Sequence, residues 1–337
     1  MRTAMVLGAY LLVTVLGGWA GDALAPSAVL AIRVGMLLVT LLLLASAHVM
    51  LDLLVAARDA ITGVGLLIAV TGVGTLAAEG RLGGGDVLPL SPNQLSMMFG
   101  FALIVHVWAI IERRATPVDK SLTVLLVALV WLTGSRTGLV ALLVAVALVA
   151  LTYSRRPSGL FVLGTVIPPA IFYILTSTGM AQAYFSRGGG QSVMTLNSRT
   201  IAWQAAFAQP YEFWQTWFGR GMSAKTVGVS GTFWDTQVLD SSWVSAFVQG
   251  GVLGFLLLAL WVSSTLVGTS RMPHPERSLY LAITVFALMW SVTASGLIDS
   301  YVLFLLMLVA SLSVDRRPLS GSVTETPAHR VHDTNRG

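Results

Sequence analysis

The residues of this sequence best suited to chemistry are arginines that interrupt very apolar stretches. The tripeptide Ser-Arg-Thr occurs at residues 135–137 and again at 198–200, and it places Arg136 and Arg199 in two polar breaks. A guanidinium group presents a planar fork of donors that matches the oxygens of a phosphate. We predict that both arginines bind an anionic group and take part in catalysis. The alternatives are that Arg136 only snorkels to lipid phosphates and that Arg199 is an ordinary surface cation.

Asp240 is the candidate proton acceptor. It closes the longest polar stretch, residues 179–241, directly before an apolar run. A carboxylate here would accept the proton of an attacking hydroxyl group. Because the unperturbed pKa of an aspartate is about 3.9, burial would have to raise that pKa for the group to act as a base. Asp is also a preferred helix N-cap, so a structural role is the alternative. Asp299 allows the same two interpretations, and there the cap is favoured.

Three further residues of the polar stretch are predicted to contact the substrate. Arg220 lies between two glycines, which let the backbone approach a ligand closely, and Arg187 precedes three glycines. Trp203 belongs to a short, largely apolar helix predicted over 199–208, which ends before Pro210. The alternatives are solvated loop arginines and an aromatic side chain that lies at the membrane interface.

Asn93 lies at a predicted helix start and is the fourth predicted substrate contact. Ser91 has the type of an N-cap, Pro92 takes the first helical position, and Gln94 completes a capping box. The N-terminus of a helix offers free N–H groups to an anion. The alternative is that this stretch is only a well-made helix terminus.

The composition assigns the chain to a membrane. Of its 337 residues, 55% are hydrophobic and 10% are charged, and the mean hydropathy is +0.79. Soluble domains carry roughly 25% charged residues, so this chain cannot present a water-compatible surface. The absence of cysteine excludes disulfides and thiolate chemistry. The sequence contains no P-loop, zinc-protease or nucleophile-elbow motif, so it predicts neither a metal nor a cofactor.

The predicted fold is an all-α integral membrane protein, because apolar runs of about 20 residues recur along the chain. We expect about ten transmembrane helices, with nine or eleven as alternatives. A large extracytoplasmic loop over 179–241 is expected to contain short amphipathic helices. The polytopic membrane domain covers residues 1–314, and residues 315–337 form a disordered cytoplasmic tail. The predicted spans are 3–21, 28–48, 60–78, 93–111, 120–135, 137–153, 158–178, 242–267, 277–295 and 297–314.

The basic residues set the predicted orientation. Short basic clusters gather in cytoplasmic loops. With both termini in the cytoplasm, Arg58 and the adjacent arginines at 113–114 and 155–156 lie inside. Arg81 and the cations of the large loop then lie outside, against the usual bias. This excess of arginine at the outer face is a second reason to expect an anionic ligand there.

Several stretches, taken in order, resemble the bacterial O-antigen ligase and Wzy-type polymerase superfamily. Residues 90–95 resemble its Pro-Asn helix start, and residues 134–139 resemble its Ser-Arg-Thr turn. Residues 198–221 resemble the opening of its large periplasmic loop, and residues 240–254 resemble the helix that closes this loop. The resemblance covers roughly residues 90–314.

The resemblance implies transfer of a glycan from undecaprenyl pyrophosphate to an acceptor hydroxyl at the outer face of the bacterial cytoplasmic membrane, without a metal. It also implies that Arg136, Arg199 and Arg220 hold the pyrophosphate. Ligases of this family carry a His-Asn pair where this chain has Asp240 and Ser241, which favours a polymerase-like or divergent transferase with Asp240 as the base.

The partners implied by the resemblance are the lipid-linked glycan, a glycan or lipid acceptor and membrane lipids, with no nucleic acid. Two other functional classes stay open. One is a transporter or flippase for an anionic lipid-linked glycan, and the other is a non-catalytic membrane partner in cell-envelope assembly.

Overall fold

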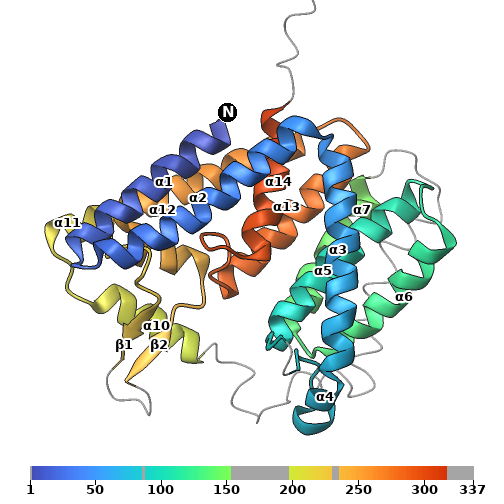
Figure 1. Ribbon diagram of the computed structural model, residues 1–337, viewed down its shortest axis with the longest axis horizontal. Coiled ribbons are helices and arrows are strands. Elements are labelled where there is room, and N and C mark those ends of the chain that lie inside the picture. The colour runs from blue at the N-terminus through green and yellow to red at the C-terminus, as the bar shows by residue number, and fades with distance from the viewer. Residues whose placement is uncertain (1, 86–87, 153–196, 230–234, 317–337) are drawn as a thin grey trace, which may run out of the picture.

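The computed structural model describes residues 2–85, 88–152, 197–229 and 235–316. This part of the chain is mostly helical, as predicted, with one short hairpin added (Figure 1). The helices are α1 (Arg2–Ala20), α2 (Leu24–Ala47), α3 (Met50–Thr71), α4 (Val73–Glu79), α5 (Pro92–Ile111), α6 (Pro117–Leu132), α7 (Arg136–Thr152), α10 (Asn197–Ala208), α11 (Phe213–Phe218), α12 (Ser242–Ser270), α13 (Glu276–Thr293) and α14 (Val302–Asp315). The strands are β1 (Thr226–Gly228) and β2 (Thr236–Val238).

Five of the described helices are long and apolar enough to cross a membrane, namely α1, α2, α3, α5 and α12. Helices α7 and α14 are apolar but shorter. Because several such helices occur in one chain, the protein is a multi-pass membrane protein. The predicted span 158–178 and the predicted tail from residue 317 lie outside the described residues. The expected number of ten spans therefore stays a prediction.

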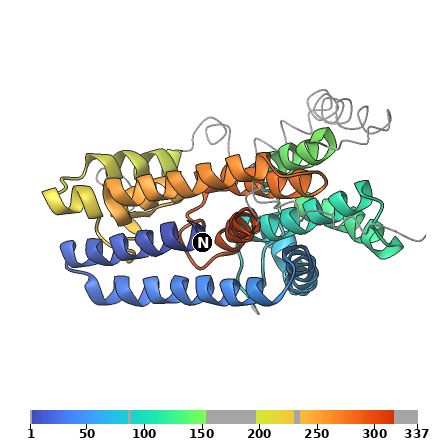
Figure 2. The same cartoon turned by 90° about the horizontal axis from the view of Figure 1, so that it is seen from above.

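The helices form two groups that meet where α12 packs against α13 and along α14. Helix α1 lies between α2 and α12 in one group, as Figure 2 shows. In the other group, α5 contacts α3, α6, α7 and α13. Helix α5 is apolar all round and most of it is buried, including Phe99, Phe101 and Ile104. Helix α2, in contrast, exposes Val29 and Ile32, as expected for a helix that faces lipid.

The third predicted span, 60–78, is wrong in its boundaries. Helix α3 begins ten residues earlier, at Met50, and ends at Thr71, and the short helix α4 follows after Gly72. Gly72 leaves the helical conformation with φ −90° and ψ 3°. A side chain at this position would collide with the backbone oxygen of Gly83, so only glycine fits the break.

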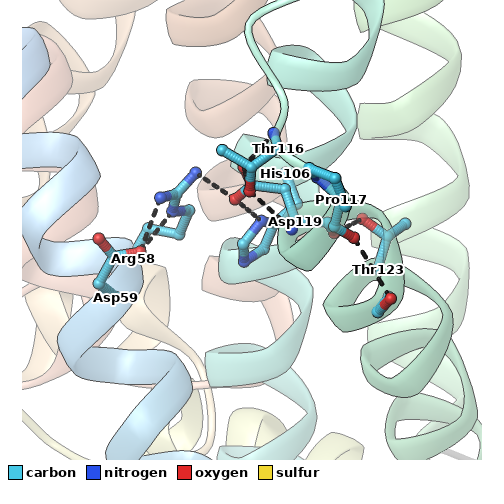
Figure 3. Close-up of polar contacts among 8 residues, drawn as sticks. Arg58, Asp59, His106, Thr116, Pro117, Asp119 and Thr123 are labelled. Atoms are coloured by element: carbon cyan, nitrogen blue, oxygen red, sulfur yellow. Dashed lines mark hydrogen bonds and ion pairs between the residues drawn. The ribbon is translucent and has the colours of Figure 1, made fainter.

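Arg58 lies inside α3 and not in a cytoplasmic loop, which corrects the orientation argument at this residue. Its Nη1 lies 3.2 Å from Oδ1 of Asp119, and Nδ1 of His106 lies 3.1 Å from the same oxygen (Figure 3). Asp119 also accepts a hydrogen bond from the backbone N–H of Thr116, in the capping box that begins α6. These three charged or titratable side chains are at most 13% exposed. Arg58 therefore has two carboxylate partners: Asp59 beside it on α3, whose Oδ1 lies 2.7 Å from Nη2 of Arg58, and Asp119 from another helix.

Helix α12 is broken near its beginning. Gly251 takes φ 63° and ψ −158°, a conformation essentially restricted to glycine. A Cβ at this position would lie 2.5 Å from the backbone of Trp217, so the end of α11 packs directly on the break. The carbonyl oxygens of Val248 and Gln249 accept hydrogen bonds from the N–H groups of Arg220 and Gly221, at 2.8 and 3.0 Å. The Gly-Arg-Gly stretch is thereby fixed to α12.

Candidate functional site

The polar segment before α12 folds into α10, α11 and the hairpin, which gather at one end of α1 and α12 (Figure 1). Strands β1 and β2 are antiparallel, and Thr226 pairs with Val238. Helix α10 begins at Asn197, two residues before the predicted start. A small apolar core joins α10 and the hairpin to the first turns of α12. Its buried members are Ala202, Ala206, Val227, Leu239, Val244 and Val248.

Arg199 and Asp240, both predicted to be catalytic, lie together at this core. Nε of Arg199 is 4.0 Å from Oδ2 of Asp240, and the two side chains are 23% and 51% exposed. Burial raises the pKa of the Asp240 carboxyl above its usual value, and the positive charge of Arg199 opposes this shift. The N-cap of α12 is Ser241, so Asp240 is not the capping residue. The arrangement holds a half-exposed carboxylate with raised basicity beside a guanidinium group.

A second ion pair lies close to the first. Nζ of Lys225 bonds to Oδ2 of Asp299, in the connection between α13 and α14. The preference for Asp299 as a helix cap is therefore wrong, since the N-cap of α14 is Tyr301. The pKa of Tyr301 is raised by burial and then by the negative charges of Asp299 and Asp240. The phenol thus lies near both carboxylates, and no local pattern in the sequence indicated this residue.

Hydrogen bonds hold these two acidic segments in place. The N–H of Leu239 donates to the carbonyl oxygen of Lys225 at 3.0 Å, which closes the hairpin next to Asp240. The hydroxyl of Ser242 donates to the carbonyl oxygen of Ala294 at 2.6 Å and accepts from the N–H of Leu297 at 3.1 Å. The start of α12 is thereby fastened to the connection that carries Asp299.

Arg220 is bound within the protein. Its Nη1 donates to the side-chain oxygen of Gln209, and its Nη2 donates to the carbonyl oxygen of Pro210 at 2.9 Å. The guanidinium carbon lies 4.8 Å from the centre of the Tyr211 ring. These contacts tie the end of α10 to the break in α12. They give Arg220 a structural role, and its predicted contact with substrate stays a prediction.

Arg136 is the first residue of α7 and is partly buried at the turn between α6 and α7. The turn is held by the Thr133 hydroxyl, which accepts from the N–H of Ser135, and by the Ser135 hydroxyl, which accepts from the N–H of Gly138, both at 3.3 Å. Thr133 and Ser135 are buried. The tight turn predicted from the sequence is therefore confirmed, and it fixes the backbone on both sides of Arg136.

Asn93 of α5 is linked to the same turn through Arg81, which bonds to both Asn93 and Thr133. The predicted capping box is present, because the hydroxyl of Ser91 accepts from the N–H of Gln94 and the side chain of Gln94 accepts from the N–H of Ser91. The side-chain oxygen of Asn93 accepts a hydrogen bond from Nη2 of Arg81 at 3.3 Å. Arg81 was expected only to lie at the outer face, and the sequence did not single it out as a site residue.

The remaining two predicted contacts are less defined. Trp203 of α10 is partly buried against the small apolar core, and no described residue bonds to its ring N–H. Arg187 lies outside the described residues. The roles predicted for both residues stay predictions.

Comparison with known proteins gives one match. Residues 121–259 match the family model described as O-antigen ligase. The match begins in α6 and ends in α12, so it contains Arg136, Arg199, Arg220 and Asp240. It confirms the resemblance to the O-antigen ligase and Wzy-type superfamily that the motifs indicated. No curated protein and no solved structure matches the chain.

Proposed function

From the O-antigen ligase domain in this chain, we propose that the protein is a membrane glycosyltransferase of cell-envelope polysaccharide synthesis. It transfers a glycan from a polyprenyl pyrophosphate carrier to an acceptor hydroxyl at the outer face of the bacterial cytoplasmic membrane. The bond between the anomeric carbon and the pyrophosphate oxygen breaks, and its electron pair leaves with the pyrophosphate. The acceptor oxygen forms the new glycosidic bond and loses its proton.

The observation that supports this proposal best is the contact between Arg199 and Asp240. Asp240 takes the proton of the acceptor hydroxyl, and the burial that raises its pKa makes it a better base than an ordinary aspartate. Arg199 keeps the carboxyl ionised at rest, at a separation of 4.0 Å. It also binds an oxygen of the departing pyrophosphate, where developing negative charge is stabilised by a fixed cation.

Arg136 binds the pyrophosphate from the turn before α7. Its place on a turn fixed by buried hydroxyl groups limits its motion, and a preorganised charge stabilises a transition state without reorganising during the reaction. Because arginines supply the positive charge, the proposal includes neither a metal nor a cofactor. The proposed topology keeps both termini in the cytoplasm, with residues 179–241 on the outer side.

Asp240→Asn tests the proposal, because it keeps the size of the side chain and removes the base. We expect the rate of glycan transfer to fall about a hundredfold or more. In cells, the lipid-linked glycan should accumulate and the polymer should be lost, while the protein remains in the membrane. Asp235→Asn is the matched control, since Asp235 is an exposed aspartate just before β2. Normal polymer in the Asp240→Asn cells would refute Asp240 as the base.

A further inference from the structure

Arg81 is a partly buried cation whose described partners are all neutral. Its Nε donates to the carbonyl oxygen of Thr133 at 3.0 Å, and its Nη2 donates to the side-chain oxygen of Asn93. Two other cations, Arg199 in α10 and Lys225 just before β1, each have a carboxylate partner. Among the described residues, no carboxylate lies within ion-pair distance of Arg81. A cation removed from water without a counter-ion is costly, so this position favours an anionic ligand.

The guanidinium group of Arg81 lies over the turn that carries Arg136. A Cβ added to Gly134 would come within 3.3 Å of Nε of Arg81, and Gly134 itself takes φ +61°. The backbone N–H of Leu82 also donates to the carbonyl oxygen of Leu132 at 2.9 Å. Two arginines are thus held at the turn between α6 and α7. Arg136 belongs to the turn, and Arg81 reaches it from the connection between α4 and α5.

A buried hydroxyl group at the same place lacks a partner. Ser96, one turn into α5 from Asn93, is 1% exposed, and its Oγ has no hydrogen-bond partner among the described residues. The hydroxyl lies against Gly138 in the first turn of α7, where any side chain on that glycine would overlap it. The start of α5 and the start of α7 therefore meet beside Arg81.

We propose that Arg81 binds a phosphate oxygen jointly with Arg136, and that the ligand is the pyrophosphate of the polyprenyl carrier. This inference rests on the proposed function and adds a binding residue that lies outside the matched segment 121–259. A pyrophosphate presents two charged groups, which two guanidinium groups on one turn can share. Asn93 acts as a positioning residue, because it orients Arg81 and need not touch the ligand.

The test measures binding of a polyprenyl pyrophosphate to the purified full chain in phosphatidylcholine nanodiscs. Arg81→Ala should weaken the affinity about ten- to a hundredfold, as expected for loss of a charge-assisted hydrogen bond. Asn93→Ala, which keeps the charge of Arg81, should weaken it less. Arg33→Ala is the matched control, because Arg33 is an exposed arginine in α2, and its affinity should equal that of the wild type.

Two conservative variants separate ligand binding from a purely structural clamp. Arg81→Lys keeps the charge and Arg81→Gln keeps hydrogen-bond donors without charge. We expect the Lys variant to retain more affinity than the Gln variant, and the salt dependence of binding to weaken in the Gln variant only. Equal affinity in the Gln variant and the wild type would overturn the proposal, even if Arg81→Ala fails to fold.

The arms of the experiment distinguish the sources of the phosphate. If Arg136→Ala loses affinity and Arg81→Ala does not, the role of Arg81 is overturned while the proposed function stands. If Arg81→Ala loses bound phosphatidylglycerol in native mass spectrometry but keeps its affinity for the carrier, the ligand is a phospholipid headgroup and the inference is overturned. If the wild type binds no polyprenyl pyrophosphate, the proposed function itself fails.

Discussion

In an Arg199→Ala variant, the Asp240 carboxyl loses the positive charge that opposes the effect of burial on its pKa. The pKa of Asp240 already lies above 3.8, and removal of Arg199 should raise it further. A base acts only when it is deprotonated, so the acidic limb of the rate profile should move to higher pH. The variant also loses a contact to the pyrophosphate, which should lower the rate about ten- to a hundredfold at every pH.

The size of the pH shift follows from the geometry. Two unit charges 4.0 Å apart interact by about 1 kcal/mol in water and about 4 kcal/mol at an effective dielectric constant near 20. Asp240 is 51% exposed, so screening by solvent keeps the value near the lower end, roughly 1–2 kcal/mol. At 1.36 kcal/mol for each pKa unit, the acidic limb should rise by about one pH unit.

The assay follows release of polyprenyl pyrophosphate from a lipid-linked glycan in proteoliposomes, between about pH 4 and pH 9. Arg199→Lys is the matched variant: it keeps the charge near Asp240, so its acidic limb should stay near that of the wild type although its rate falls. An acidic limb at the same pH in the wild type and in Arg199→Ala would show that the titrating group is not Asp240, and the reasoning would be wrong.

Two predictions concern stability. Asp119→Ala removes one of the two carboxylates that contact Arg58, together with the acceptor of the capping box of α6, so the free energy of unfolding should fall by about 1–3 kcal/mol, measured as a lower midpoint in thermal unfolding in detergent. An Asp119→Ala protein as stable as the wild type would show that Asp59 alone is a sufficient counter-ion for Arg58. Gly251→Ala forces an alanine into a glycine conformation against the backbone of Trp217, and it should cost at least about 1–3 kcal/mol. Gly63→Ala is its control, because a Cβ on Gly63 meets nothing within 4 Å, and equal stability of the two variants would contradict the account of the break.

Local signals in the sequence predicted much of the fold. The capping box at Ser91 and Gln94 depends on residues three apart, and the structure confirms it. The apolar runs predicted most helices within a few residues, because burial in lipid requires a minimum length of apolar side chains. The contact between Arg199 and Asp240 joins two residues that were each predicted to take part in catalysis. The chemical roles of both residues stay predictions.

The features that the sequence did not predict depend on contacts between distant segments. Arg58 was predicted to be a loop cation, and its second carboxylate partner, Asp119, lies sixty-one positions later in the sequence. Asp299 resembles a helix cap because nothing near it in the sequence indicates Lys225. Arg81 bonds to the carbonyl oxygen of Thr133 because the α4–α5 connection packs against the α6–α7 turn, which lies about fifty residues further along the chain. Interhelical partners of this kind are set by packing, which a single sequence does not encode in its periodicity.

The break in α12 bears on the choice between the proposed transferase and a transporter. A transporter uses broken helices near the membrane midplane, where unpaired backbone groups bind the transported ion or substrate. In this chain, the carbonyl oxygens of Val248 and Gln249 next to the break are occupied by the N–H groups of Arg220 and Gly221. Each of these oxygens thus has a donor within the chain, which favours a structural role for the break. A break closed by the chain's own backbone instead holds the polar segment rigidly beside Asp240, and a transferase needs its base and its cations fixed in this way.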